Sequence, residues 1–190
     1  MLDFSIAKIS LNTKYSYLNT ILKTETLHTE EQIWDYIREV TDPEIPVLNI
    51  IEMGIARSVS IDQTGKVLVK ITPTYSGCPA MNAIEKMVKE KLEEKNVEDF
   101  EVKLDFSEAW TTDWMTEEAK AKLKDYGIAP PEKTASDDDF LKNLSGTKIV
   151  PCPFCDSFET ELQSQFGSTA CKSQYFCNSC HQPFEHFKCI

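Results

Sequence analysis

The sequence predicts a small α/β (α+β) domain followed by a cysteine-rich, metal-binding tail. Helical and strand-like patterns alternate between residues 27 and 128. Prolines and an aspartate run then fill residues 129–147, which is typical of a linker. Six of the seven cysteines lie in the tail. We therefore expect four parts: an extension without a firm pattern (1–26), the α/β domain (27–128), the linker (129–147) and a zinc-ribbon tail (148–190).

The first predicted helix begins after Thr29. Thr29 and Gln32 form a capping-box pattern, in which each side chain accepts a hydrogen bond from the other residue's backbone amide. Apolar residues then recur on one helical face. The helix is expected to end at Asp42-Pro43, because proline disfavours helical geometry in the residue before it.

A hairpin and a parallel crossover are predicted next. Strand alternation around Val59 and again from Val67 to Ile71 is separated by a turn at 62–65. A turn-rich loop then opens into an amphipathic helix, and a third strand follows with Val102, Leu104 and Phe106 on one face. This stretch is long enough for a right-handed parallel connection. A last helix is expected at 116–126, ended by Gly127.

The tail carries two Cys-x-x-Cys motifs separated by 21 residues. Two residues between cysteines let both sulfurs face one ion, so two such motifs predict a tetrahedral site of four thiolates. Zinc and a single iron both accept this ligand set. A thioredoxin-like redox pair, the alternative, needs only one such motif. We take the metal, most simply structural zinc, to be held by Cys152, Cys155, Cys177 and Cys180.

Cys171 and Cys189 exceed what one four-thiolate site requires. Each is either a small buried apolar residue or part of a second thiol pair near the metal. His181 and His186 are expected to be structural or solvated, because four thiolates are already available.

Cys78 lies where a strand gives way to a helix, between Gly77 and Pro79. Proline suits the first helical position, and a helix N-terminus lowers the pKa of a nearby thiol. This placement suits a reactive or metal-binding thiol, while a buried core cysteine explains the position equally well.

Asp42 and Glu44 supply two carboxylates on a proline-bounded turn. Either they contact a ligand or they only form the turn.

Composition argues against several classes of function. The chain has 20 Lys and Arg against 31 Asp and Glu, a net charge of −11, and its tail is also slightly acidic, so nucleic acid is not an expected partner. No apolar run is long enough to span a membrane, and no signal-peptide pattern begins the chain, so we expect a cytoplasmic protein. No cofactor fingerprint or nucleophile–base pair predicts an enzyme. Trp110 and Trp114 are expected in a core or an interface.

Two sets of residues together resemble known families. The acidic turn 42–46, Asn49-Ile50 and the loop from Thr72 to Pro79 resemble the family catalogued as domain of unknown function 59. This family includes bacterial SufT-type proteins and a subunit of the eukaryotic cytosolic iron–sulfur targeting complex. Residues 166–172, the second Cys-x-x-Cys motif and residues 183–189 narrow the resemblance to the PaaD (PaaJ) family of aerobic phenylacetate degradation.

The resemblance implies an iron–sulfur cluster assembly or targeting factor for the phenylacetyl-CoA epoxidase. The implied client is the ferredoxin-type reductase component, with the di-iron oxygenase component as a second candidate, and the implied partners include the iron–sulfur assembly machinery. Cys78 is then the position expected to handle iron or a cluster, with Asp42 and Glu44 nearby. Cys171 and Cys189 also fall within the matched tail, so a sulfur-rich transfer site that includes them is a further hypothesis. The alternative is a structural accessory subunit of the epoxidase, and a homodimer is a further expectation.

Overall fold

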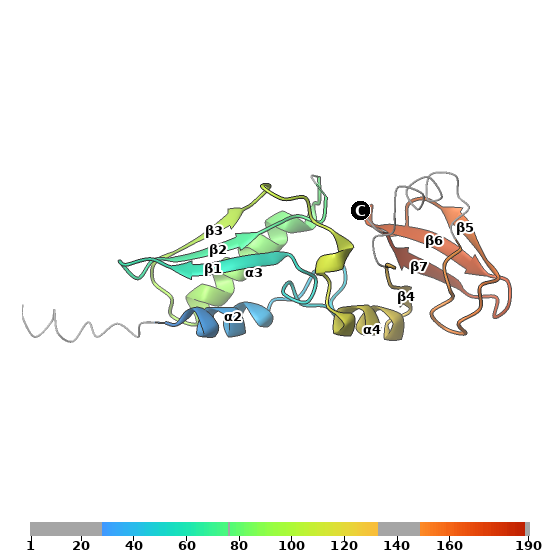
Figure 1. Cartoon of the computed structure of the whole chain (residues 1–190), viewed down its shortest axis with the longest axis horizontal. Helices are drawn as coiled ribbons and strands as arrows, with labels where there is room; N and C mark the ends of the chain where they lie inside the picture. The colour runs from blue at the N-terminus through green and yellow to red at the C-terminus, as the bar shows by residue number, and fades with distance from the viewer. Residues whose placement is uncertain (1–27, 76, 133–148, 189–190) are drawn as a thin grey trace, which may run out of the picture.

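A computed structural model describes residues 28–75, 77–132 and 149–188. An α/β part and a β-rich ribbon lie side by side along the long axis, with helix α4 between them (Figure 1). Residues 1–26, most of the predicted linker and Cys189 lie outside the described residues, so the predictions made for them stay predictions.

The α/β part is built on a three-stranded sheet of order β1-β2-β3. Strands β1 (Ala56–Ile61) and β2 (Val67–Ile71) are antiparallel, and β2 is parallel to β3 (Phe100–Leu104). Helix α3 (Ala80–Glu94) makes the crossover, and α2 (Glu30–Arg38) contacts α3 and β1. The hairpin and the parallel crossover predicted from the sequence are confirmed.

Local signals set most helix ends. The capping box of α2 is present, with Thr29 Oγ1 accepting from the Gln32 amide at 3.2 Å. Helix α4 (Glu117–Asp125) follows the short 3-10 helix η1 (Thr112–Trp114) and ends before Gly127, whose φ of 88° requires the left-handed region.

The predicted place of Phe106 in the third strand is wrong. The strand ends at Leu104, and the Phe106 side chain is 63% exposed. The Asp105 carboxylate accepts a hydrogen bond of 2.9 Å from the Ser107 amide, which forms a local turn and takes Phe106 out of the sheet.

The ribbon is a four-stranded sheet of order β4-β7-β6-β5. Strands β5 (Thr160–Ser164), β6 (Lys172–Cys177) and β7 (Pro183–Phe187) form an antiparallel meander. The fourth strand, β4 (Ile128–Ala129), follows α4 directly and pairs parallel to β7. This strand was not predicted, because two residues are too few for a period. The pairing ties the ribbon to the α/β part.

The two parts also share a hydrophobic core. Cys171 and Phe187 of the ribbon pack into the core of the α/β part, whereas Cys152 and Cys177 belong to a separate, smaller core under the ribbon sheet. Trp110 lies at the junction: its Nε1 donates to the Met53 carbonyl at 3.0 Å, and its ring meets Phe187 edge-on at 6.1 Å. The expectation that Trp110 lies in a core or an interface is confirmed.

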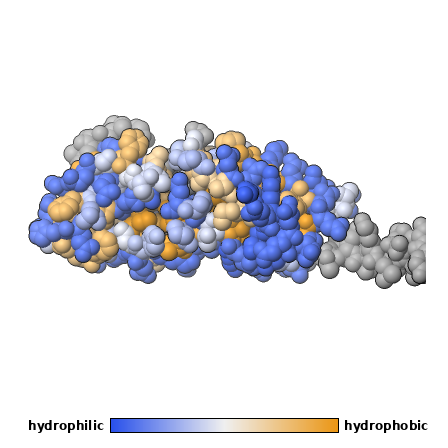
Figure 2. Space-filling view, turned by 180° about the vertical axis from the view of Figure 1, so that it is seen from behind, coloured by the Kyte–Doolittle hydropathy of each residue, from blue (hydrophilic) through white to orange (hydrophobic). Residues whose placement is uncertain are grey.

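One face of the molecule is mainly polar. The face seen in Figure 2 is largely hydrophilic, with smaller apolar patches between the charged areas. Within the described ranges, none of the helices has the length and apolar character required to cross a membrane.

Candidate functional site

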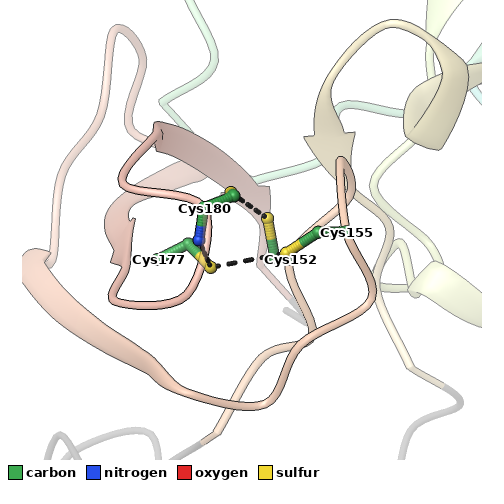
Figure 3. A group of neighbouring side chains, drawn as sticks. All are labelled: Cys152, Cys155, Cys177 and Cys180. Carbon is green, nitrogen blue, oxygen red and sulfur yellow. Dashed lines mark hydrogen bonds between the residues drawn. The ribbon is translucent and has the colours of Figure 1, made fainter.

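Four cysteines meet at one end of the ribbon, as predicted. The Sγ atoms of Cys152, Cys155, Cys177 and Cys180 all lie within 4.8 Å of one another (Figure 3). The pairs Cys152–Cys180 and Cys155–Cys177 are each 3.6 Å apart. A zinc–sulfur bond of about 2.3 Å makes each edge of a tetrahedral site about 3.8 Å. The four thiols therefore fit one tetrahedral metal ion of zinc size, which would hold the two loops together.

Both Cys-x-x-Cys loops have the same backbone geometry. In each, the residue after the second cysteine donates its amide to the carbonyl of the first at 2.9 Å, and that residue, Asp156 or His181, has a positive φ. Asp and His are among the side chains that tolerate this region. Amides of Cys180 and Ser179 donate to Cys177 and lower its thiol pKa to about 7, which favours a metal-binding thiolate.

A second group of polar and sulfur-bearing residues surrounds a small recess at the junction of the two parts. Asp42 and Glu44 come from the turn after α2, Thr74 and Cys78 from the loop before α3, and Cys171 from the residue before β6. Apolar side chains complete the wall. The recess has room for roughly one water molecule. The structure thus brings together Cys78, Asp42 and Glu44, and it adds Cys171 from the ribbon.

The acidic turn has a clear structural role. Asp42 Oδ1 accepts hydrogen bonds from the amides of Glu44 at 2.8 Å and Ile45 at 2.9 Å. Burial raises the pKa of the Asp42 carboxyl although both amides oppose this. Burial, with the neighbouring charge of Asp42, also raises the pKa of Glu44, while Lys172 and a hydrogen bond with Thr169 lower it. Asp42 therefore forms the turn, and Glu44 is left facing the ribbon.

Cys78 is half-buried and is held by its own loop. Its amide donates to the Tyr75 carbonyl at 3.1 Å, and its sulfur accepts hydrogen bonds involving the Ala80 amide and Thr74. Pro79 is the N-cap of α3, one position before the first helical residue. The prediction of a lowered thiol pKa is wrong: burial raises the pKa of Cys78, outweighing both hydrogen bonds, and Glu44 adds to the rise.

Cys171 is buried, and Thr169 Oγ1 lies 3.0 Å from its sulfur. Burial raises its thiol pKa, and charges on Glu44 and Cys78 act in the same direction. The expectation of a thiol near the ribbon metal is not met by this cysteine, because it packs with the α/β core rather than with the four-cysteine cluster. Its sulfur neighbour across the recess is Cys78.

Sequence reasoning missed two ribbon residues that act on Glu44 beside the recess. Lys172 is buried and its Nζ pairs with Glu185 at 3.0 Å, while Thr169 contacts Glu44. No spacing could reveal these neighbours, because they depend on how the ribbon packs on the α/β part. His186 is buried in β7 and His181 is exposed, and neither belongs to the four-cysteine group.

Comparison with known proteins agrees with this two-part organisation. Residues 30–104 match the family model described as iron-sulfur cluster assembly protein, and residues 136–188 match the PaaD zinc beta ribbon domain. A protein of Escherichia coli (strain K12), named as one of the subunits of 1,2-phenylacetyl-CoA epoxidase, is 42% identical over 159 residues, which are 84% of this chain and 92% of the relative. The chain belongs to the PaaD family.

Other relatives match about half of this PaaD-family chain. An Fe-S protein maturation auxiliary factor of Porphyromonas gingivalis is 39% identical over 103 residues, covering 54% of this chain and 97% of the relative. The auxiliary factor SufT of Staphylococcus aureus is 36% identical over 85 residues, covering 44% and 96%. A solved structure of a domain of unknown function from Bacillus anthracis covers 50% of this chain and 90% of its own, with 27% identity and a TM-score of 0.46.

Proposed function

We propose that this PaaD-family chain is an iron–sulfur assembly or targeting factor for the phenylacetyl-CoA epoxidase system, and that it handles iron or a cluster through Cys78. The observation that carries the proposal is the placement of a half-buried thiol beside two carboxylates, within the segment that matches the assembly-protein family. Two relatives that cover about half of this chain are named as Fe-S protein maturation auxiliary factors, which supports the same role.

The chemistry needed is exchange of thiolate ligands. A cluster or iron ion moves between proteins when one cysteine replaces another as its ligand. Cys78 supplies the thiolate, and hydrogen bonds involving the Ala80 amide and Thr74 stabilise its charged form. Burial keeps the free thiol protonated near neutral pH, so cargo binding displaces a proton to water. The protein therefore needs no turnover chemistry of its own.

The client we favour is the ferredoxin-type reductase component of the epoxidase. Plant-type clusters in such proteins are held by cysteine thiolates, which can accept cargo from Cys78 by direct exchange. The di-iron oxygenase component is the second candidate. The name of the Escherichia coli relative supports the epoxidase system as the setting and does not discriminate between these components.

A structural accessory subunit is the second candidate function. The Escherichia coli relative is named as a subunit of the epoxidase itself, which favours stoichiometric assembly with the oxygenase. In that case Cys78 only packs, and the ribbon metal only holds the tail.

Client loading separates these functions. The reductase and oxygenase components are co-expressed with the wild-type chain or with Cys78→Ala in a host without another copy. We expect the variant to lower iron and acid-labile sulfide in the purified reductase several-fold, with zinc in the chain unchanged. Full occupancy with Cys78→Ala would contradict the proposal. Loss of epoxidase activity when the chain is stripped from fully loaded components would establish the accessory role instead.

A further inference from the structure

The ribbon contributes a thiol to the site of the α/β part. Cys78 and Cys171 lie about 90 residues apart in the chain and line the same recess. A charge on Cys78 also raises the pKa of Cys171, as expected for two thiols that line one recess. The carboxylate of Glu44 acts on both thiols. Three groups that bind metal ions therefore surround one small space.

Two lysines on the ribbon favour negative charge at this place. Lys172 lowers the pKa of Cys171 and of Glu44, and its ammonium is itself buried. Lys188 is partly buried, which lowers its pKa, and the charge of Cys171 opposes this. Its Nζ donates to the Gln165 carbonyl at 2.9 Å. The ribbon thus adds a second thiol and two lysines that favour a thiolate at Cys171, of which Lys172 also pairs with Glu185.

We propose that Cys171 is the second thiolate of the cargo site, so that Cys78 and Cys171 together bind one Fe²⁺ ion, with the Glu44 carboxylate as the oxygen ligand. The inference deepens the proposed function and rests on it. Two sulfurs and one carboxylate form a mixed ligand set that borderline divalent ions accept. The recess has room for one small group, which suits a single ion better than a cluster.

Fe²⁺ binding at this site requires no oxidation or reduction. Each thiol loses its proton to water and forms one sulfur–iron bond, and iron stays Fe²⁺. Two thiolates and one carboxylate leave a tetrahedral ion with one open position, which an incoming thiolate of a client can occupy. Transfer then proceeds as the client's sulfur enters and Cys78 or Cys171 leaves.

The recess is less preorganised than the ribbon site. Among the described residues, the four ribbon cysteines are the only group of three or more His, Cys, Asp or Glu residues whose ligand atoms all lie within 4.8 Å of one another. The side chains around the recess must therefore close on the ion, which lowers affinity and eases release. This property suits a protein that hands its cargo to another.

The test uses the full chain with zinc already bound to the ribbon, titrated anaerobically with Fe²⁺ and, for an optical thiolate signal, with Co²⁺. We expect one further equivalent to bind the wild type. Cys171→Ser, which keeps the size and a hydrogen-bonding group beside Thr169, should weaken this binding at least tenfold, and Cys78→Ala should abolish it. Ser173→Ala, a buried neighbour that does not line the recess, should bind like the wild type.

Two outcomes distinguish failure of this inference from failure of the proposed function. Wild-type affinity in Cys171→Ser together with loss in Cys78→Ala would overturn the role of Cys171 and leave Cys78 as the single ligand. Wild-type affinity in both variants would overturn the role of Cys171 and also the proposed function of Cys78. A measurement on the wild type guards against misfolded variants: Fe²⁺ should protect Cys171 and Cys78 together from alkylation, and protection of Cys78 alone would contradict the inference.

Discussion

The molecule contains two groups of thiols that differ in how the chain brings them together. In the ribbon, four sulfurs are gathered with 3.6 Å between paired atoms; backbone amides lower the pKa of Cys177 to about 7, while burial raises that of Cys180 to about 12. In the junction recess, two thiols line one small space with two carboxylates, and burial raises both thiol pKa values. The first arrangement favours permanent binding, and the second favours binding that is weak and reversible.

The difference arises from the local chain rather than from the residue type. Backbone amides at each Cys-x-x-Cys turn donate to that turn's own sulfurs, and the ribbon site forms from residues 152–180 alone. The recess depends on two distant segments, because its two cysteines come from separate parts of the protein that meet only after folding. Metal binding at the ribbon site therefore stabilises the fold of the ribbon, whereas the recess forms only once the two parts have folded and packed together.

Removing a ribbon ligand should have the largest effect. In Cys152→Ser we expect zinc per chain to fall to near zero and the ribbon strands to lose hydrogen-exchange protection, because structural zinc contributes about 10–16 kcal/mol in small metal domains. Helices α2 and α3 should stay protected, since their core does not contain these cysteines. A ribbon that keeps its protection without zinc would contradict the structural role of this site.

Opening the junction should have the next largest effect. Phe187 is fully buried against Trp110, so Phe187→Ala is expected to lower the free energy of unfolding by about 3–5 kcal/mol. Zinc should remain bound in the folded protein, while the extra Fe²⁺ equivalent is lost because Cys171 no longer faces Cys78. Chemical denaturation and metal analysis measure the two effects. Loss of zinc together with retained Fe²⁺ binding would contradict the account, because it would mean that the ribbon site, and not the recess, depends on the junction.

Removing the carboxylate charge should have a moderate effect on the recess alone. We expect Glu44→Gln, which replaces the proposed oxygen ligand by a neutral amide, to weaken Fe²⁺ binding at least about tenfold, the cost of removing even a group that only supports a metal ligand. Zinc content should not change. Glu101→Gln, at an exposed position on β3, is the matched control and should bind like the wild type. An equal effect of both variants would show that only net charge matters.

The smallest effect concerns thiol reactivity and its pH dependence. Because the thiolate is the reactive form and both pKa values are raised, alkylation of Cys78 and Cys171 should be slow at pH 7 and rise about tenfold per pH unit until the pKa is reached. Thr74→Val removes a hydrogen bond to Cys78 and should slow its alkylation several-fold. Rates that level off below pH 8 would contradict the raised values. Mass spectrometry resolves each cysteine.

Much of the fold was predictable because its signals are local. The capping box at Thr29, the hairpin turn ended by Gly65 and the cap at Gly127 each lie within a few residues of the structure that they set. The spacing of the two Cys-x-x-Cys motifs likewise predicts the four-thiolate site. The strand β4 was not predictable, because two residues carry no period and pair only with the distant β7.

The recess was predictable only in part, for the same reason. The resemblance to assembly proteins indicated Cys78, Asp42 and Glu44 together, and the structure places all three at one recess. Cys171 could not be assigned there, because its neighbour is set by packing across the junction. The direction of the Cys78 pKa shift could not be predicted from the sequence either. The sequence shows the helix N-terminus, which lowers the thiol pKa, but it does not show the burial, which raises the pKa by more.

The most direct test of the account is a metal and sulfide analysis of the chain purified without oxygen, as wild type and as Cys78→Ala. We predict about one zinc per chain in both proteins, with additional iron, with or without acid-labile sulfide, in the wild type only. Zinc without iron in both proteins, even after Fe²⁺ is supplied, would contradict the claim that Cys78 handles iron.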